Sequence, residues 1–82
     1  MNPQVSVVIV NYNSGSALAS TLASLSEGLD GLAWEAVVVD NASTDGSEHV
    51  AEGRPNVRVV RHSANAGFAA GVNIGAAASS AP

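Results

Sequence analysis

Three segments of the chain are dominated by β-branched apolar residues. They are VSVVIVNY at 5–12, AWEAVVV at 33–39 and VRVV at 57–60. The first segment is apolar at both odd and even positions, as expected for a parallel strand that is covered on both faces. The third is shorter and more polar. We therefore predict three strands.

Three further segments have helical features. They are 16–28, where leucines recur at i, i+4 and i+7; 47–52, which begins with acidic character; and 68–76, where Phe68, Val72 and Ala76 recur at helical spacing. Ser14 or Ser16 can cap the first helix, and Gly28 ends it. The order of elements is strand, helix, strand, helix, strand, helix.

This alternation predicts an α/β fold of three layers with a mostly parallel sheet and helices on its faces. In such sheets, ligands bind outside the carboxyl ends of the strands. Polar residues follow each predicted strand at that end: Asn11, Tyr12 and Asn13, then Asp40 and Asn41, then Asn65 and Gly67. We expect these groups to converge on one edge of the sheet.

Composition limits the classes of function. The 82 residues suffice for one small domain, and 46% hydrophobic against 12% charged residues indicates a folded core. The net charge is −4, lysine is absent, and the three arginines fall between positions 54 and 61, so a nucleic-acid partner is not expected. The absence of cysteine excludes disulfides and thiolate metal sites.

The sequence does not predict a membrane span. The N-terminal segment has no secretory signal pattern, and its apolar run is too short to cross a bilayer. Gly67, Gly71 and Gly75 resemble the small-residue face of a membrane helix, but Asn65 and Asn73 interrupt the apolar stretch. Close packing of a helix on the sheet explains the glycines better. We predict a cytoplasmic protein, or one at the inner face of the membrane.

The polar groups at the strand ends predict a neutral to acidic pocket. Such a pocket suits a ligand rich in N–H and O–H donors, for example the base and ribose of a nucleotide, and Tyr12 can stack on a base. A simpler reading is that Asp40, Asn41, Ser43 and Asp45 only form turns or cap the next helix. His49 and His62 have no partner at metal-ligand spacing, so we assign them no function.

Three sequence motifs together resemble family 2 glycosyltransferases, the inverting enzymes with the GT-A fold. VSVVIVNYN resembles the opening strand of that family, WEAVVVDNASTDGS its second strand with a D-x-x-S-x-D signature, and NAGFAAGVNIG the segment after the third strand. The last motif is most similar to the rhamnosyltransferase-like branch. The resemblance extends from Val5 to about Ala78 and implies a partial GT-A, Rossmann-like nucleotide-binding half.

The resemblance also implies roles for individual residues. The residues expected to bind the nucleotide sugar are Val10, Tyr12, Asp40, Asn41, Asn65 and Gly67. Structural roles are implied for Ser43 and Asp45 in the turn, and for Asn73 in holding the following helix. Asn41 stands where the family often has a second aspartate, and its amide oxygen can still accept a hydrogen bond from a pyrimidine N–H.

The family would transfer a sugar from a UDP- or dTDP-sugar to a hydroxyl of a glycan or lipid-linked acceptor, with Mg or Mn stabilising the departing diphosphate. No carboxylate follows Glu52. We therefore assign no catalytic base and no metal ligand to this chain, and we interpret residues 1–82 as the N-terminal, nucleotide-sugar-binding part of a domain truncated before its D-x-D motif. The alternatives are a non-catalytic nucleotide-binding or interaction module, and a generic α/β domain of receiver or dinucleotide type. The dinucleotide version lacks its glycine fingerprint.

Overall fold

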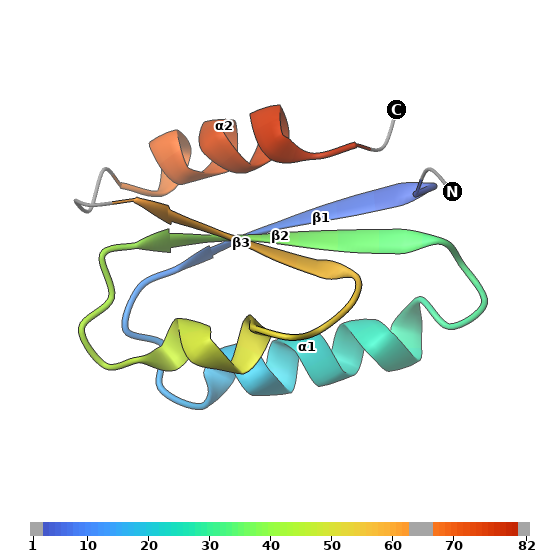
Figure 1. Cartoon of the computed structure of the whole chain (residues 1–82), viewed down its shortest axis with the longest axis horizontal. Coiled ribbons are helices and arrows are strands. Elements are labelled where there is room, and N and C mark those ends of the chain that lie inside the picture. Colours follow the sequence, from blue (N-terminus) through green and yellow to red (C-terminus); the bar gives the residue numbers. More distant parts are fainter. Residues whose placement is uncertain (1–2, 63–66, 81–82) are drawn as a thin grey trace.

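Three parallel strands form the middle layer of the molecule (Figure 1). The computed structural model describes residues 3–62 and 67–80. Its strands are β1 (Val5–Asn11), β2 (Trp34–Asn41) and β3 (Val57–His62). Both neighbouring pairs are parallel, and the order β1-β2-β3 places β2 in the centre. The predicted parallel sheet is confirmed.

Helices cover both faces of this sheet. The helix α1 (Ala17–Gly28) and the 3-10 helix η1 (Ser47–Ala51) lie on one face, and α2 (Phe68–Ala78) lies on the other (Figure 1). This arrangement is the predicted three-layer α/β fold. Within residues 3–62 and 67–80, neither α1 with 12 residues nor α2 with 11 has the length and apolar character needed to cross a bilayer.

The central strand β2 is buried on both faces, which explains its unbroken apolar run. Residues 36–39 have no exposed surface. Ala36 and Val38 pack with Leu18, Leu22 and Ala51 from the α1 and η1 layer. Because side chains alternate along a strand, Val37 and Val39 face α2. One strand thus supplies the interior of both interfaces.

Glycines, rather than large apolar residues, form the contact between α2 and the sheet. Gly71 and Gly75 are buried, whereas Phe68 is 73% exposed. A Cβ atom at Gly71 would lie 2.8 Å from both methyl groups of Val10. The sequence pattern identified the helix through Phe68, but Phe68 does not face the sheet. The close packing that we predicted from the glycine spacing is confirmed.

The start of α1 differs from the prediction. Ser16 occupies the N-cap position, but no side-chain hydrogen bond caps the helix. The Ser14 hydroxyl instead donates a hydrogen bond of 2.6 Å to Asn11 Oδ1. Ser14, one of the two predicted cap residues, is therefore hydrogen-bonded to the buried side chain of Asn11 at the end of β1.

The substitution Gly75→Ala tests the close packing of α2. An added methyl group would overlap Val8 Cγ1 and lie 3.1 Å from Val39 Cγ2. Overpacking costs about 1–3 kcal/mol, and alanine recovers up to about 1 kcal/mol of helix propensity. We expect the free energy of unfolding, measured in urea, to fall by about 1–2 kcal/mol.

Gly28→Ala is the matched control for this substitution. Gly28 ends α1, and a Cβ atom there meets nothing within 4 Å. We expect its stability to equal that of the wild type or to exceed it slightly. A Gly75→Ala protein as stable as the Gly28→Ala protein would contradict the packing of α2 described above.

Candidate functional site

The polar residues at the ends of β1 and β2 converge as the sequence predicted. Asn11 lies beside Asp40, and Asp40 lies beside Arg61 of β3 in the strand register. The loops that follow β1 and β2 leave the sheet at this same edge (Figure 1). We call this edge the carboxyl rim, defined by residues 11–16, 40–47 and 61–62.

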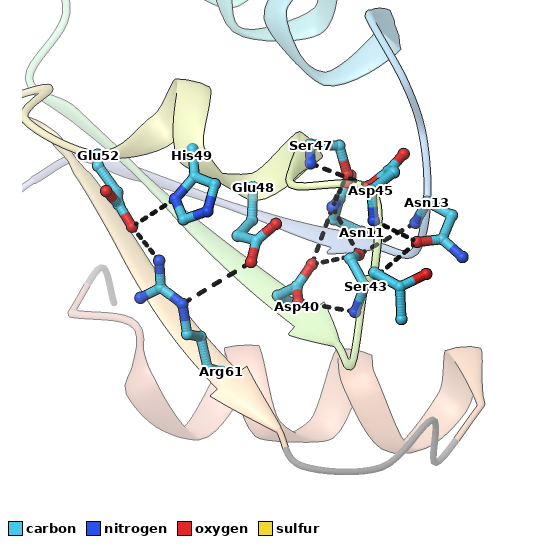
Figure 2. Close-up of polar contacts among 11 residues, drawn as sticks. Asn11, Asn13, Asp40, Ser43, Asp45, Ser47, Glu48, His49, Glu52 and Arg61 are labelled. Atoms are coloured by element: carbon cyan, nitrogen blue, oxygen red, sulfur yellow. Dashed lines mark hydrogen bonds and ion pairs between the residues drawn. The ribbon is translucent and has the colours of Figure 1, made fainter.

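Asn11 is the centre of a buried hydrogen-bond network at the carboxyl rim (Figure 2). Its side chain is almost completely buried, with 2% of the residue exposed. Its Nδ2 donates to Asp40 Oδ1 at 2.9 Å, to Ser47 Oγ at 2.9 Å and to Ser43 Oγ at 3.3 Å. These contacts join β1, the end of β2 and the start of η1.

Protein donors surround the carboxylate of Asp40. Besides Asn11, it accepts a bond of 2.6 Å from the Ser43 hydroxyl and one of 3.0 Å from the Ser43 backbone N–H. Burial acts to raise the pKa of Asp40, but the bonds from Ser43 and Asn11, with the nearby Arg61 charge, outweigh it and lower the pKa below its ordinary value. Asp40 is therefore a buried, ionised anchor for the turn.

A second set of contacts connects the loop after β1 to the loop after β2. Asn13 Oδ1 accepts from the backbone N–H of Thr44 at 2.8 Å and of Asp45 at 3.3 Å. Asp45 Oδ2 accepts from the Gly15 N–H at 3.0 Å, and its Oδ1 accepts from the Ser47 N–H at 2.9 Å. The bonds from Ser47 to this carboxylate lower the pKa of Asp45. Asn13 and Asp45 thus hold the two loops together.

Asn41 follows Asp40 in sequence but faces the opposite side of the sheet. Its Nδ2 donates to the carbonyl oxygen of Gly67 at 3.2 Å, and it lies 3.4 Å from the Cβ position of Gly71, on the α2 side. Its Oδ1 is buried and has no hydrogen-bond partner within residues 3–62 and 67–80. The two residues predicted to recognise a base therefore lie in different layers of the rim.

The other predicted residues occupy varied environments. Tyr12 is 51% exposed, directly after β1, and Val10 is half-buried against Gly71. Asn73 lies on the exposed part of α2. Asn65 falls outside the residues that the structure describes. Tyr12, Asp40, Asn41, Ser43 and Asp45 belong to the rim, and Val10 and Gly67 lie beside it, near Asn41 and Gly71. The ligand-binding roles of Val10, Tyr12, Asp40, Asn41 and Gly67 and the turn roles of Ser43 and Asp45 stay predictions.

Sequence reasoning missed an ion-pair cluster between η1 and β3. Arg61 binds Glu52, which also contacts His49 at 3.2 Å, and Arg61 Nε lies 3.9 Å from Glu48 Oε2 (Figure 2). Glu48 is only 7% exposed, and its Oε1 lacks a hydrogen-bond partner within the described ranges. The signal in the sequence was the acidic start of this short helix beside the group of arginines.

The rim presents mainly oxygen acceptors and one exposed aromatic ring. Among residues 3–62 and 67–80, no group of three or more histidine and acidic side chains is arranged to hold a metal ion. Chemically, this arrangement can bind a ligand with N–H and O–H donors and an aromatic face.

Comparisons with known proteins agree with the fold. The sequence model of the family "Glycosyl transferase family 2" matches residues 6–82. The solved mannosyltransferase PcManGT from Pyrobaculum calidifontis, in complex with GDP-Man and Mn2+, is 30% identical, with a TM-score of 0.74. The match covers 90% of this chain and 24% of that enzyme's chain. The search of curated proteins gave no match.

The charge of Asp40 predicts how stability depends on pH. Because its pKa is lower in the folded chain than in the unfolded chain, the ionised group stabilises the fold at neutral pH. This contribution is lost as the pH falls from about 4 through the folded-state pKa. We expect Asp40→Asn to lower the free energy of unfolding by about 1–3 kcal/mol near neutral pH, and by progressively less in acid.

Urea unfolding at a series of pH values measures this difference. Asp30→Asn is the control, since Asp30 lies exposed in the loop after α1. Its stability should follow that of the wild type at every pH. A constant difference between Asp40→Asn and wild type down to the most acidic pH would show that the Asp40 charge does not contribute.

Proposed function

Because the chain belongs to glycosyl transferase family 2, we propose that it forms the nucleotide-sugar-binding part of an inverting glycosyltransferase. The complete enzyme would transfer a sugar from a UDP- or dTDP-sugar to a hydroxyl of a glycan or lipid-linked acceptor. The base-activated hydroxyl would attack the anomeric carbon from the face opposite the departing diphosphate. The rhamnosyltransferase-like branch and a cytoplasmic location stay predictions, supported by the sequence alone.

The observation that carries this proposal is the position of Tyr12 at the carboxyl rim. Tyr12 is 51% exposed and directly follows β1, and its two neighbours in sequence, Asn11 and Asn13, are held by hydrogen bonds to the loop after β2. Parallel α/β sheets bind ligands at this edge. The neighbouring solved structure, which shares this part of the fold, binds the nucleotide sugar GDP-Man. We assign Tyr12 to stacking on the base.

Asn41 favours a base that offers an N–H donor. Its amide Nδ2 donates to the Gly67 carbonyl oxygen, and its buried Oδ1 has no partner among the described residues, so we infer that a base N–H reaching this edge would be accepted by Oδ1. Uracil, thymine and guanine each present a ring N–H beside a carbonyl group, whereas the corresponding ring nitrogens of cytosine and adenine are acceptors. This chemistry supports UDP or dTDP and is also compatible with GDP.

We propose that a divalent metal takes part only in the complete enzyme. The solved mannosyltransferase contains Mn2+. The described part of this chain does not provide a fitting set of ligands, so Mg or Mn would be held by residues outside it. Arg61 brings a positive charge to the rim, but it already pairs with Glu52 and lies close to Glu48.

Nucleotide titration of the chain tests the proposal directly. We expect UDP, dTDP or GDP to shift the amide NMR signals of Tyr12, Asp40, Asn41 and Gly67, and we expect CDP and ADP to shift them less. Tyr12→Ala should weaken binding about tenfold, because base stacking on an aromatic ring contributes about 1–3 kcal/mol. Leu32→Ala removes a comparably exposed apolar side chain from the loop before β2 and should leave the affinity unchanged.

The titration tests the nucleotide site, and a sugar-transfer assay on the complete protein separates the proposal from a non-catalytic interaction module. A module that binds nucleotide without chemistry would give these shifts and never support sugar transfer, even within the complete protein. An absence of shifts at millimolar nucleotide would exclude a nucleotide site in this chain. Shifts spread evenly over α1 and the amino ends of the strands would place the ligand away from the rim.

We further expect the 82-residue chain alone to be inactive in sugar transfer. No carboxylate follows Glu52, and the earlier rim carboxylates, Asp40 and Asp45, are engaged with protein donors. A radiolabelled transfer assay with GDP-Man, UDP-sugars or dTDP-sugars and added Mg or Mn measures this. Turnover above the background of heat-denatured protein would contradict our assignment of catalysis to residues outside the chain.

A further inference from the structure

Tyr12 occupies an unusual position between two residues whose side chains are both fixed. Asn11 before it is buried and bonded to Asp40 and Ser47. Asn13 after it receives the backbone N–H groups of Thr44 and Asp45, and its own N–H donates to Ser43 Oγ at 3.0 Å. The backbone of an exposed aromatic residue is therefore held from both sides.

Asn13 and Asp45 form a reciprocal bridge between the two rim loops. The Asn13 side chain accepts from the backbone of the loop after β2, and the Asp45 side chain accepts from Gly15 in the loop after β1. Each loop thus supplies a side chain that satisfies the backbone of the other. We call these contacts the Asn13–Asp45 bridge.

The backbone at Asn13 supports the same interpretation. Its φ of 46° lies in the left-handed region, which asparagine tolerates better than most residues. This turn redirects the chain immediately after Tyr12 and allows Asn13 Oδ1 to reach Thr44. The local conformation of Tyr12 therefore depends on a turn that a contact with the second loop stabilises.

We propose that the Asn13–Asp45 bridge is a positioning device that holds Tyr12 ready to stack on the base of a nucleotide. This inference rests on the proposed nucleotide site and adds two positioning residues to it. Asn13 and Asp45 act through the backbone of Tyr12 and are not themselves assigned to touch the ligand. A loop that is ordered before binding loses less conformational entropy when the ligand arrives, so the affinity is higher.

The test is a double-mutant cycle on the 82-residue chain. Asn13→Gly keeps the left-handed turn accessible but removes the side-chain acceptor. If the bridge holds Tyr12 ordered, its loss should reduce the binding-competent fraction to about a tenth and weaken UDP or GDP binding about tenfold. In a Tyr12→Ala background, the same change should alter the affinity by less than about twofold, because the positioned ring is gone.

Asp45→Ala is a second, independent variant with the same expected behaviour, and Thr44→Ala is the matched control. Thr44 takes part in the bridge only through its backbone N–H, so the loss of its side chain should leave the affinity unchanged. Equal weakening by Asn13→Gly in both Tyr12 backgrounds would overturn the proposal, since the bridge would then act independently of the ring.

A measurement without ligand keeps the two proposals distinguishable. NMR relaxation should give the Tyr12 amide an order parameter of about 0.85 in the wild type and below about 0.6 in Asn13→Gly. An equally ordered Tyr12 in both proteins would overturn the positioning role. If Tyr12 loses order in Asn13→Gly and the wild-type chain binds none of the nucleotides, only the proposed function would be overturned.

Discussion

The buried hydrogen bond between Asn11 and Asp40 is the interaction on which the arrangement of the carboxyl rim depends. It joins two neighbouring strands where their apolar cores end, and it extends through Ser43 and Ser47 to the next helix. A buried amide and a buried carboxylate are costly unless each is satisfied. Here each is hydrogen-bonded to the other, so Asn11 and Asp40 can both be buried at the ends of β1 and β2.

The alternation of side chains along β2 then divides the rim into two parts. Asp40 joins the layer of α1 and η1, where it organises the turn. Asn41 joins the layer of α2, where it contacts Gly67. A ligand at this edge would lie across the end of the sheet, with a rigid acidic network on one side and the start of a glycine-rich helix on the other. Asp40 and Asn41 are adjacent in sequence, but they lie on opposite sides of the proposed site.

Local patterns in the sequence predicted the elements, the parallel sheet and the convergence of Asn11, Asp40 and Asn41, because strand periodicity and the rule for parallel sheets need no long-range detail. They did not predict that Phe68 would be exposed while Gly71 and Gly75 are buried, since apolar spacing does not show which face can approach a sheet closely. The contacts of Arg61 with Glu48 and Glu52 depend on how η1 packs beside β3. The hydrogen bond from the Thr44 backbone N–H to Asn13 Oδ1 joins residues 31 positions apart in the sequence. Such pairings arise only from the folded arrangement.

The glycine contacts of α2 also determine the position of this helix along β1. Gly71 and Gly75 stand about 6 Å apart along the helix axis, and the side chains of Val10 and Val8, which they meet, stand about 6.7 Å apart along the strand. The two spacings nearly coincide, so Val10 packs against Gly71 while Val8 packs against Gly75. A shift of α2 along β1 by part of a turn would break both contacts. The placement of the Gly67 carbonyl beside Asn41 is therefore determined by apolar contacts one and two helical turns further along α2.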